Sequence, residues 1–172
     1  MNILKIPSMK KKEYDAFIAQ EFVSRIAFKG DYPYIAPFLY VFDGQFIYFL
    51  STKYGKKVEL LHTNPQVAVE IENYSSDMSD YRFVTLQGRI NEVDERSEKL
   101  KVRQMFVDMI KKNNLSLNVL VALGHSPEDP LESLMEEERS TVWKLVDVKE
   151  IVALKSSLYL NINLTKHPDD KL

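Results

Sequence analysis

Three runs of aromatic and β-branched residues, each followed by a turn signal, constrain the fold of this chain most strongly. The runs cover residues 22–30, 33–42 and 45–50, and the breaks between them contain Gly30-Asp31 and Asp43-Gly44. Aromatic and β-branched residues favour strands, and Asp-Gly and related pairs favour tight hairpin turns. The first fifty residues therefore predict two consecutive hairpins.

Later segments continue the β pattern after one short interruption. Residues 54–62 change period and predict a short helix, which Asn64-Pro65 ends. Four further runs are typical of strands: residues 67–73, 81–93, 141–148 and 151–157. The polar loop SSDMSD joins the first two of these runs.

Two amphipathic helices are also predicted. Ser8 is a suitable cap for the first helix, whose apolar residues follow helical spacing at Tyr14, Phe17, Ile18 and Phe22. We expect it to be a lid on the core. Asp94 is a suitable cap for the second helix, whose apolar stripe is Val102, Met105, Phe106, Met109 and Ile110. We interpret that stripe as core, and GHSPEDPLESLMEEER as a loop with a short, solvated acidic helix.

The predicted fold is mainly β. About seven strands in hairpins with few helices favour an antiparallel barrel of the Greek-key type with flanking helices, because closure removes exposed sheet edges. With 172 residues, 45% of them hydrophobic, the chain can bury one core but is short for two domains. We expect a single domain over residues 1–172, with a polar tail from about residue 165.

Composition excludes several kinds of site. The net charge of -2 gives no general attraction to nucleic acid or to an anionic membrane, so a basic site must be local. The chain has no cysteine, which excludes disulfides and thiolate chemistry. His62, His125 and His167 lie far apart, so we expect no metal site. The sequence has neither a run of 18 apolar residues nor a cleavable leader pattern, and we expect a cytoplasmic protein with no membrane span.

The order of these elements resembles a known family. The stretch PYIAPFLYVFDGQFIYFLSTKYGKKVELLHTNPQVAVEIE combines an aromatic hairpin, a D-G turn, an S-T-x-x-G-K-K element and an N-P-x-V-A element. In this order and spacing, across residues 10–95, it resembles the pyridoxamine 5'-phosphate oxidase-like split barrels that bind FMN, including their nitroimidazole-resistance-like branch. The resemblance implies a split β-barrel and a homodimer that holds FMN in clefts between its subunits.

The resemblance also suggests which residues hold the cofactor phosphate. Ser51 and Thr52 match the family's hydroxyl positions, and Lys56 matches the second basic residue of the phosphate motif, with Lys57 beside it. A helix N-terminus and a mobile ammonium both suit a phosphate. The alternative is that the two lysines are only the exposed start of a helix.

Three residues of the second run and one tryptophan complete the candidate cofactor site. Pro37 lacks the N–H that a ladder needs, so it marks an edge or a bulge. The resemblance places the flavin ring along Pro37, Phe38 and Leu39; the alternative is a bulge with no ligand role. Trp143 is the only tryptophan. It could stack on the partner subunit's flavin, or lie buried in the core or the dimer interface.

The reaction itself is less constrained. The arginine and the basic, aromatic C-terminal segment of true vitamin B6 oxidases have no counterpart here, and the histidine of nitroimidazole-resistance relatives is replaced by Leu50, Ser51 and Thr52. The leading interpretation is an FMN-dependent oxidoreductase with a small-molecule electron donor and acceptor. The alternatives are a non-catalytic module that stores or senses flavin, and a split barrel that uses haem or a deazaflavin.

Overall fold

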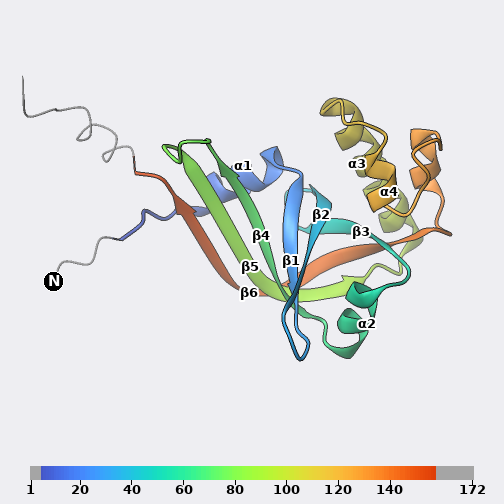
Figure 1. Ribbon diagram of the computed structural model, residues 1–172, viewed down its shortest axis with the longest axis horizontal. Helices are drawn as coiled ribbons and strands as arrows, with labels where there is room; N and C mark the ends of the chain where they lie inside the picture. The colour runs from blue at the N-terminus through green and yellow to red at the C-terminus, as the bar shows by residue number, and fades with distance from the viewer. Residues whose placement is uncertain (1–4, 158–172) are drawn as a thin grey trace, which may run out of the picture.

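A computed structural model describes residues 5–157, which form a closed antiparallel barrel with the strand order β1-β2-β3-β6-β5-β4 (Figure 1). The strands are β1 (Val23–Phe28), β2 (Tyr34–Phe42), β3 (Ile47–Thr52), β4 (Gln66–Tyr74), β5 (Tyr81–Glu92) and β6 (Ser140–Lys155). The helices are α1 (Lys11–Gln20), α2 (Lys56–Thr63), α3 (Arg96–Lys112), α4 (Val119–Ala122) and the 3-10 helix η1 (Leu131–Met135). The predicted mainly β barrel with flanking helices is confirmed. His167 and the predicted polar tail lie outside the described residues.

The number of strands differs from the prediction. Residues 141–148 and 151–157 were expected as two strands, but β6 runs through both segments and pairs with β5 along most of its length. The ladder shifts register between Gln87 and Arg89, and Asp147 adopts a positive φ of 50° opposite that shift. Between the pairs that Gln87 and Arg89 form, β6 has three residues, 147–149, opposite Gly88 alone. This bulge bends the long strand pair without ending it, because extra residues change the strand direction while pairing continues on both sides.

The predicted helix caps are wrong by two residues in α1 and by one residue in α3. Helix α1 begins at Lys11 with Lys10 at the N-cap, while Ser8 forms an isolated bridge with Leu154 of β6. Helix α3 is capped by Glu95 rather than Asp94, and the Glu95 carboxylate accepts from the N–H groups of Ser97 and Glu98 at 3.0 and 2.6 Å. The Glu95 carboxylate thus satisfies two free N–H groups in the first turn of α3. In α1 the N-cap side chain accepts none, and the Lys10 N–H instead donates to the Glu13 carboxylate at 2.8 Å.

Two apolar clusters stabilise the fold. The first fills the barrel and includes Phe17 and Ile18 of α1, so α1 is the predicted lid, and the Tyr40 hydroxyl donates to the Ile18 carbonyl at 2.7 Å. The second lies between the barrel and α3, where Val102, Phe106 and Ile110 are buried. Figure 1 shows α3 and α4 together on one side of the barrel, and α2 at the end away from α1.

The stripe predicted for α3 is therefore core in its three fully buried members, whereas Met105 and Met109 are only half-buried against the second cluster. Within residues 5–157, no helix has the length and apolar character needed to cross a bilayer.

Candidate functional site

The barrel is open between β2 and β3 over part of its height. The two strands pair only from Tyr40 to Phe42, opposite Ile47 to Phe49. Beyond that point Leu50–Thr52 of β3 pair with β6, and Tyr34–Leu39 of β2 pair with β1 alone. One edge of β2 is therefore free of ladder partners where β3 departs from it.

Pro37 lies on this free edge. Backbone groups alternate in direction along a strand, and the Tyr40 N–H donates to the Phe22 carbonyl on the β1 side at 2.9 Å. The backbone groups of Ile35, Pro37 and Leu39 therefore face the opening. The sequence left open whether Pro37 marks an edge or a bulge. The register with β1 continues through Pro37 without a shift, so the residue marks an edge.

Helix α2 begins beside the opening. Its N-cap is Gly55, whose φ of 102° is one that residues with a side chain rarely adopt, and no side chain caps this end. The N–H groups of Val58 and Glu59 both donate to the Gly55 carbonyl, while those of the first two helical residues have no partner within the helix. This terminus therefore has free N–H donors and positive dipole that suit an anion.

Two lysines of the first turn of α2 reach over aromatic rings of β2. The Nζ of Lys56 lies 4.9 Å from the centre of the Tyr34 ring, and the Nζ of Lys57 lies 5.1 Å from the centre of the Phe38 ring. Lys56 is exposed, whereas Lys57 is half-buried, and burial lowers the pKa of Lys57 below its usual value. Both ammonium groups therefore lie at the opening, and neither forms an ion pair with a described residue.

The two hydroxyl residues end β3 on the far side of the opening. Ser51 is fully buried, and its hydroxyl donates to the Thr52 carbonyl at 3.0 Å. Thr52 is half-buried, and its hydroxyl donates to the Tyr54 carbonyl, also at 3.0 Å. Each hydroxyl would have to rotate in order to donate to a ligand, and Thr52 is the more accessible of the two.

An aromatic cluster lies beneath the lysines. Phe38 contacts Trp143 with ring centres 5.7 Å apart, and Phe28 contacts both rings at 6.2 and 6.3 Å. Trp143 is only 2% exposed and belongs to the barrel core. The structure thus brings Lys57, Phe38 and Trp143 together, while Pro37 is exposed on the outer face of the sheet.

Tyr34 was not predicted as a site residue. It lies on the same face of β2 as Phe38, four residues earlier, and it is the ring beneath Lys56. The period-2 alternation along Tyr34, Ala36 and Phe38 could have indicated it.

A polar cleft of about 620 Å³ adjoins the site on the other side of α2. Its lining includes Thr52, Lys53, His62, Glu92, Asp94 and Trp143. Thr52 and Trp143 are shared with the predicted cofactor residues, so the cleft reaches the same region of the barrel. Within residues 5–157, no group of three or more His, Asp or Glu side chains is placed to hold a metal ion.

Comparison with known families identifies the chain. Residues 10–130 match the family model described as pyridoxamine 5'-phosphate oxidase. The chain belongs to the pyridoxamine 5'-phosphate oxidase family. The match spans β1 to β5 and all of α2 and α3, so the opening and the lysine pair are part of the family's domain. A search of the curated proteins found no match.

Solved structures support the fold of this family member. An FAD-binding protein from Mesorhizobium loti is 19% identical with a TM-score of 0.65, and the alignment covers 90% of this chain and 100% of that one. A candidate 5-nitroimidazole antibiotic resistance protein from Bacteroides thetaiotaomicron is 15% identical with a TM-score of 0.58. The alignment covers 89% of this chain and 91% of that one. General Stress Protein 26 from Bacillus anthracis is 18% identical with a TM-score of 0.56, and the alignment covers 85% of this chain and 95% of that one. At these identities the likeness concerns the fold alone.

Proposed function

We propose that this protein binds FMN at the opening between β2 and β3, and that it is an oxidoreductase acting on a small molecule. One observation carries the proposal. The free edge of β2 ends beside the uncapped first turn of α2, where Lys56 and Lys57 are without acidic partners among the described residues. A flat ring system with a phosphate tail matches a strand edge that leads to a cationic helix start.

The residues present fit each part of FMN. The edge of β2 at Ile35, Pro37 and Leu39 presents backbone groups to the polar rim of a flavin ring. At the phosphate end, Lys56 and the first N–H groups of α2 supply positive charge, with Lys57, Thr52 and Ser51 as further contacts. Trp143 lies under Phe38, so it supports the ring wall from the core, and direct contact with a flavin stays a prediction.

A homodimer would cover the open side of this site. One row of outward-facing residues crosses five strands of the barrel: Pro37, Arg25, Glu70, Thr85 and Val152. Val23 and Ile35 flank that row and are 46% and 61% exposed, while Val152 is 43% exposed. A sheet face that combines exposed apolar side chains with polar and charged ones is typical of a surface that a partner covers.

Bound flavin would supply the electron transfer, and the chain would supply position and electrostatics. The polar cleft beside α2 contains cations and carboxylates, including Lys53, Glu92 and Asp94, and could admit a polar electron donor and acceptor in turn. The two alternatives are a module that binds flavin without turnover and a split barrel that uses haem or a deazaflavin. The experiment below distinguishes both from an FMN-dependent oxidoreductase.

The test is the absorption spectrum of the purified protein and chromatography of whatever heat releases from it. The proposal expects a yellow protein that releases FMN, and a flavin that NADH, NADPH or another reductant bleaches and an acceptor restores. Release of FAD would show that the cofactor is FAD and not FMN, and a Soret band would indicate haem instead. A yellow protein that no donor bleaches would favour the storage or sensing module. A colourless protein that does not bind FMN added at micromolar concentration would contradict the proposal.

A further inference from the structure

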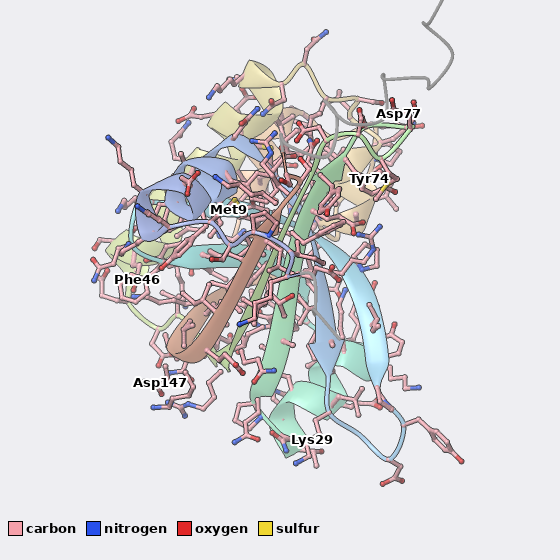
Figure 2. All side chains as sticks on the ribbon, turned by 90° about the vertical axis from the view of Figure 1, so that its left-hand side faces the viewer. Met9, Lys29, Phe46, Tyr74, Asp77 and Asp147 are labelled. Atoms are coloured by element: carbon pink, nitrogen blue, oxygen red, sulfur yellow. The ribbon has the colours of Figure 1, made fainter. Side chains whose placement is uncertain are left out.

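A small pocket lies where α3 meets the end of β5 and the start of β6. Its volume is about 270 Å³, near the lower end of the range for small-molecule sites. Its lining comes from β5, α3, β6, the loop that follows η1, and Lys53 after β3. It shares no residue with the sheet face assigned to the homodimer. Figure 2 shows Lys29 and Asp147 toward the barrel end away from α3, and neither charge belongs to the lining.

Arg103 lies at the buried end of this pocket and has no counterion there. It is 1% exposed, and its three hydrogen bonds go to uncharged acceptors, on Leu134 and Ser140. Its Nε has no hydrogen-bond partner, and the guanidinium forms no ion pair, within residues 5–157. Burial lowers the pKa of Arg103, which Glu137 opposes without bonding to it. A buried charge is costly unless an opposite charge accompanies it, so the inner end favours an anion.

The Thr141 hydroxyl is a second donor at the same place. Thr141 lines the pocket, and its Oγ1 is buried and lacks a hydrogen-bond partner in the described part of the chain. Its backbone pairs with Ser51 in the β3–β6 ladder, so the main chain is fixed while the side chain can change rotamer. Buried polar groups are normally hydrogen-bonded. The Thr141 hydroxyl and the Arg103 Nε both lack an acceptor, and a carboxylate has two oxygen atoms to supply one to each.

The rim of the pocket is slightly acidic. Lys99 and Glu137 lie 4.0 Å apart and offset each other. Glu92, Glu138 and Lys53 are exposed and form no ion pair with a described residue, so two carboxylates stand against one ammonium. Such a rim repels a phosphate dianion and attracts a positively charged group.

We propose that this pocket binds a small zwitterion of the amino-acid type, with its carboxylate at Arg103 and Thr141 and its ammonium at Glu92 and Glu138. The carboxylate would neutralise the buried guanidinium and give both unsatisfied donors an acceptor. The ammonium would offset the acidic rim. Lys53, Glu92 and Thr141 also line the polar cleft beside α2, so the two spaces adjoin and the cleft gives the ligand a way in.

The experiment is an NMR titration of the isotope-labelled protein as purified, with glycine, β-alanine and 4-aminobutyrate as probes of increasing charge separation. We expect at least one probe to shift the amide signals of Thr141 and Val142. For the tightest probe, conversion of its carboxylate to an amide should weaken binding at least about tenfold. Replacement of its ammonium by hydrogen should weaken binding about threefold. The proposal is wrong if no probe shifts these signals at millimolar concentration, or if either comparator binds as tightly as the zwitterion.

Thr141→Val separates a ligand role from a structural one. Valine keeps the shape of the side chain and removes a hydroxyl that has no partner, so the free energy of unfolding should not fall. Affinity for the tightest probe should fall about tenfold. Thr63→Val, which removes an exposed hydroxyl of α2, is the matched control and should leave affinity unchanged. Lost stability with unchanged affinity in Thr141→Val would contradict the proposal.

A double variant tests the rim, with Arg103 left intact because its bonds hold α3 in place. Glu92→Gln/Glu138→Gln should weaken the zwitterion about threefold and leave the comparator without an ammonium unchanged. Equal losses for both ligands would show that the ammonium does not lie at these carboxylates. Lys56→Ala should change neither affinity, whether or not the protein binds FMN. Loss of probe binding in Lys56→Ala would place the probes at the proposed phosphate site and overturn the proposal.

Discussion

The ammonium group of Lys57 lies 5.1 Å from the centre of the Phe38 ring, in the part of β2 that does not pair with β3. This contact joins the first turn of α2 to the barrel core. It also explains why Lys57 is half-buried, and burial in turn lowers the pKa of its ammonium group. The contact places a titrating cation at the phosphate end of the proposed site.

The first prediction concerns the pH dependence of FMN binding. A bound phosphate favours the charged ammonium, so affinity should be highest below the pKa of Lys57 in the free protein. It should fall as pH rises through that pKa, which lies below the usual 10.5. The measurement is the ratio of FMN to riboflavin affinity from pH 7 to 10, because the ratio removes titration of the flavin ring. Lys57→Met should flatten the ratio over this range. An unchanged slope in that variant would mean that Lys57 does not contact the phosphate.

The second prediction concerns the dimer. Ile35→Glu places a charge on the exposed sheet face beside Pro37 and should shift the protein from dimer to monomer in light scattering, since an unpaired buried charge opposes association. Tyr32→Glu is the matched control, because Tyr32 is 85% exposed in the loop beyond β1 and lies outside the strands of that face. A wild-type protein of 20.0 kDa at working concentration would contradict the homodimer directly.

The third prediction concerns a buried arginine. Arg103 of α3 is 1% exposed, and its guanidinium donates to the Leu134 carbonyl and to the Ser140 hydroxyl and carbonyl at 2.7 to 2.9 Å. These bonds tie α3 to η1 and to the start of β6. A lysine cannot reach all three acceptors, so Arg103→Lys should lower the free energy of unfolding by about 2–3 kcal/mol in urea titrations. Arg96→Lys, at the exposed start of the same helix, should have little effect. Equal losses in the two variants would show that the buried bonds contribute nothing specific.

The fourth prediction concerns stability at acid pH. Burial, with Arg139 next in effect, lowers the pKa of His125 below 6.5. Its Nδ1 lies 3.2 Å from the Ser133 hydroxyl oxygen, and its buried Nε2 has no partner among the described residues. The unfolded chain therefore takes up a proton before the folded protein does. The contribution of His125 is complete above pH 6.5 and is lost as pH falls from 6.5 toward the lowered pKa.

Urea unfolding at pH 7.5 and 5.5 measures this effect. Wild type should lose more stability than His125→Gln between the two values, whatever the absolute cost of the substitution. Equal losses would show that His125 is protonated with similar ease in both states. Gly124, the residue before His125, lies against Thr52, so opening of this loop would also reach the proposed site.

Local signals predicted the strands and turns well, because alternation and Asp-Gly pairs act within a few residues. Helix starts were less certain, since Asp94 and Glu95 are adjacent residues with the same capping chemistry, and only the backbone path selects between them. Strand number was overestimated because nothing in residues 141–157 shows that Asp147 bends one strand instead of ending it.

The candidate site was predictable in part. The lysines, hydroxyls and Pro37 were indicated by their order along the chain, and Pro37 does mark an edge. The opening itself depends on where β3 stops pairing with β2 while it continues to pair with β6, which is a long-range property of the barrel. Arg103 was missed because a charged residue in a helix normally indicates exposure, and its acceptors lie more than thirty residues away.

The affinities of wild type and Lys56→Ala for FMN and for riboflavin test the central claim most directly. Removing a charged hydrogen-bond partner of the phosphate should cost about 1.5–3 kcal/mol, or about a ten- to hundredfold loss of FMN affinity. Riboflavin lacks the phosphate, so its affinity should hardly change, and Lys10→Ala on the exposed start of α1 should change neither ligand. If Lys56→Ala leaves FMN affinity within about twofold of wild type, the lysine pair is only a solvated helix start, and the proposed phosphate site is wrong.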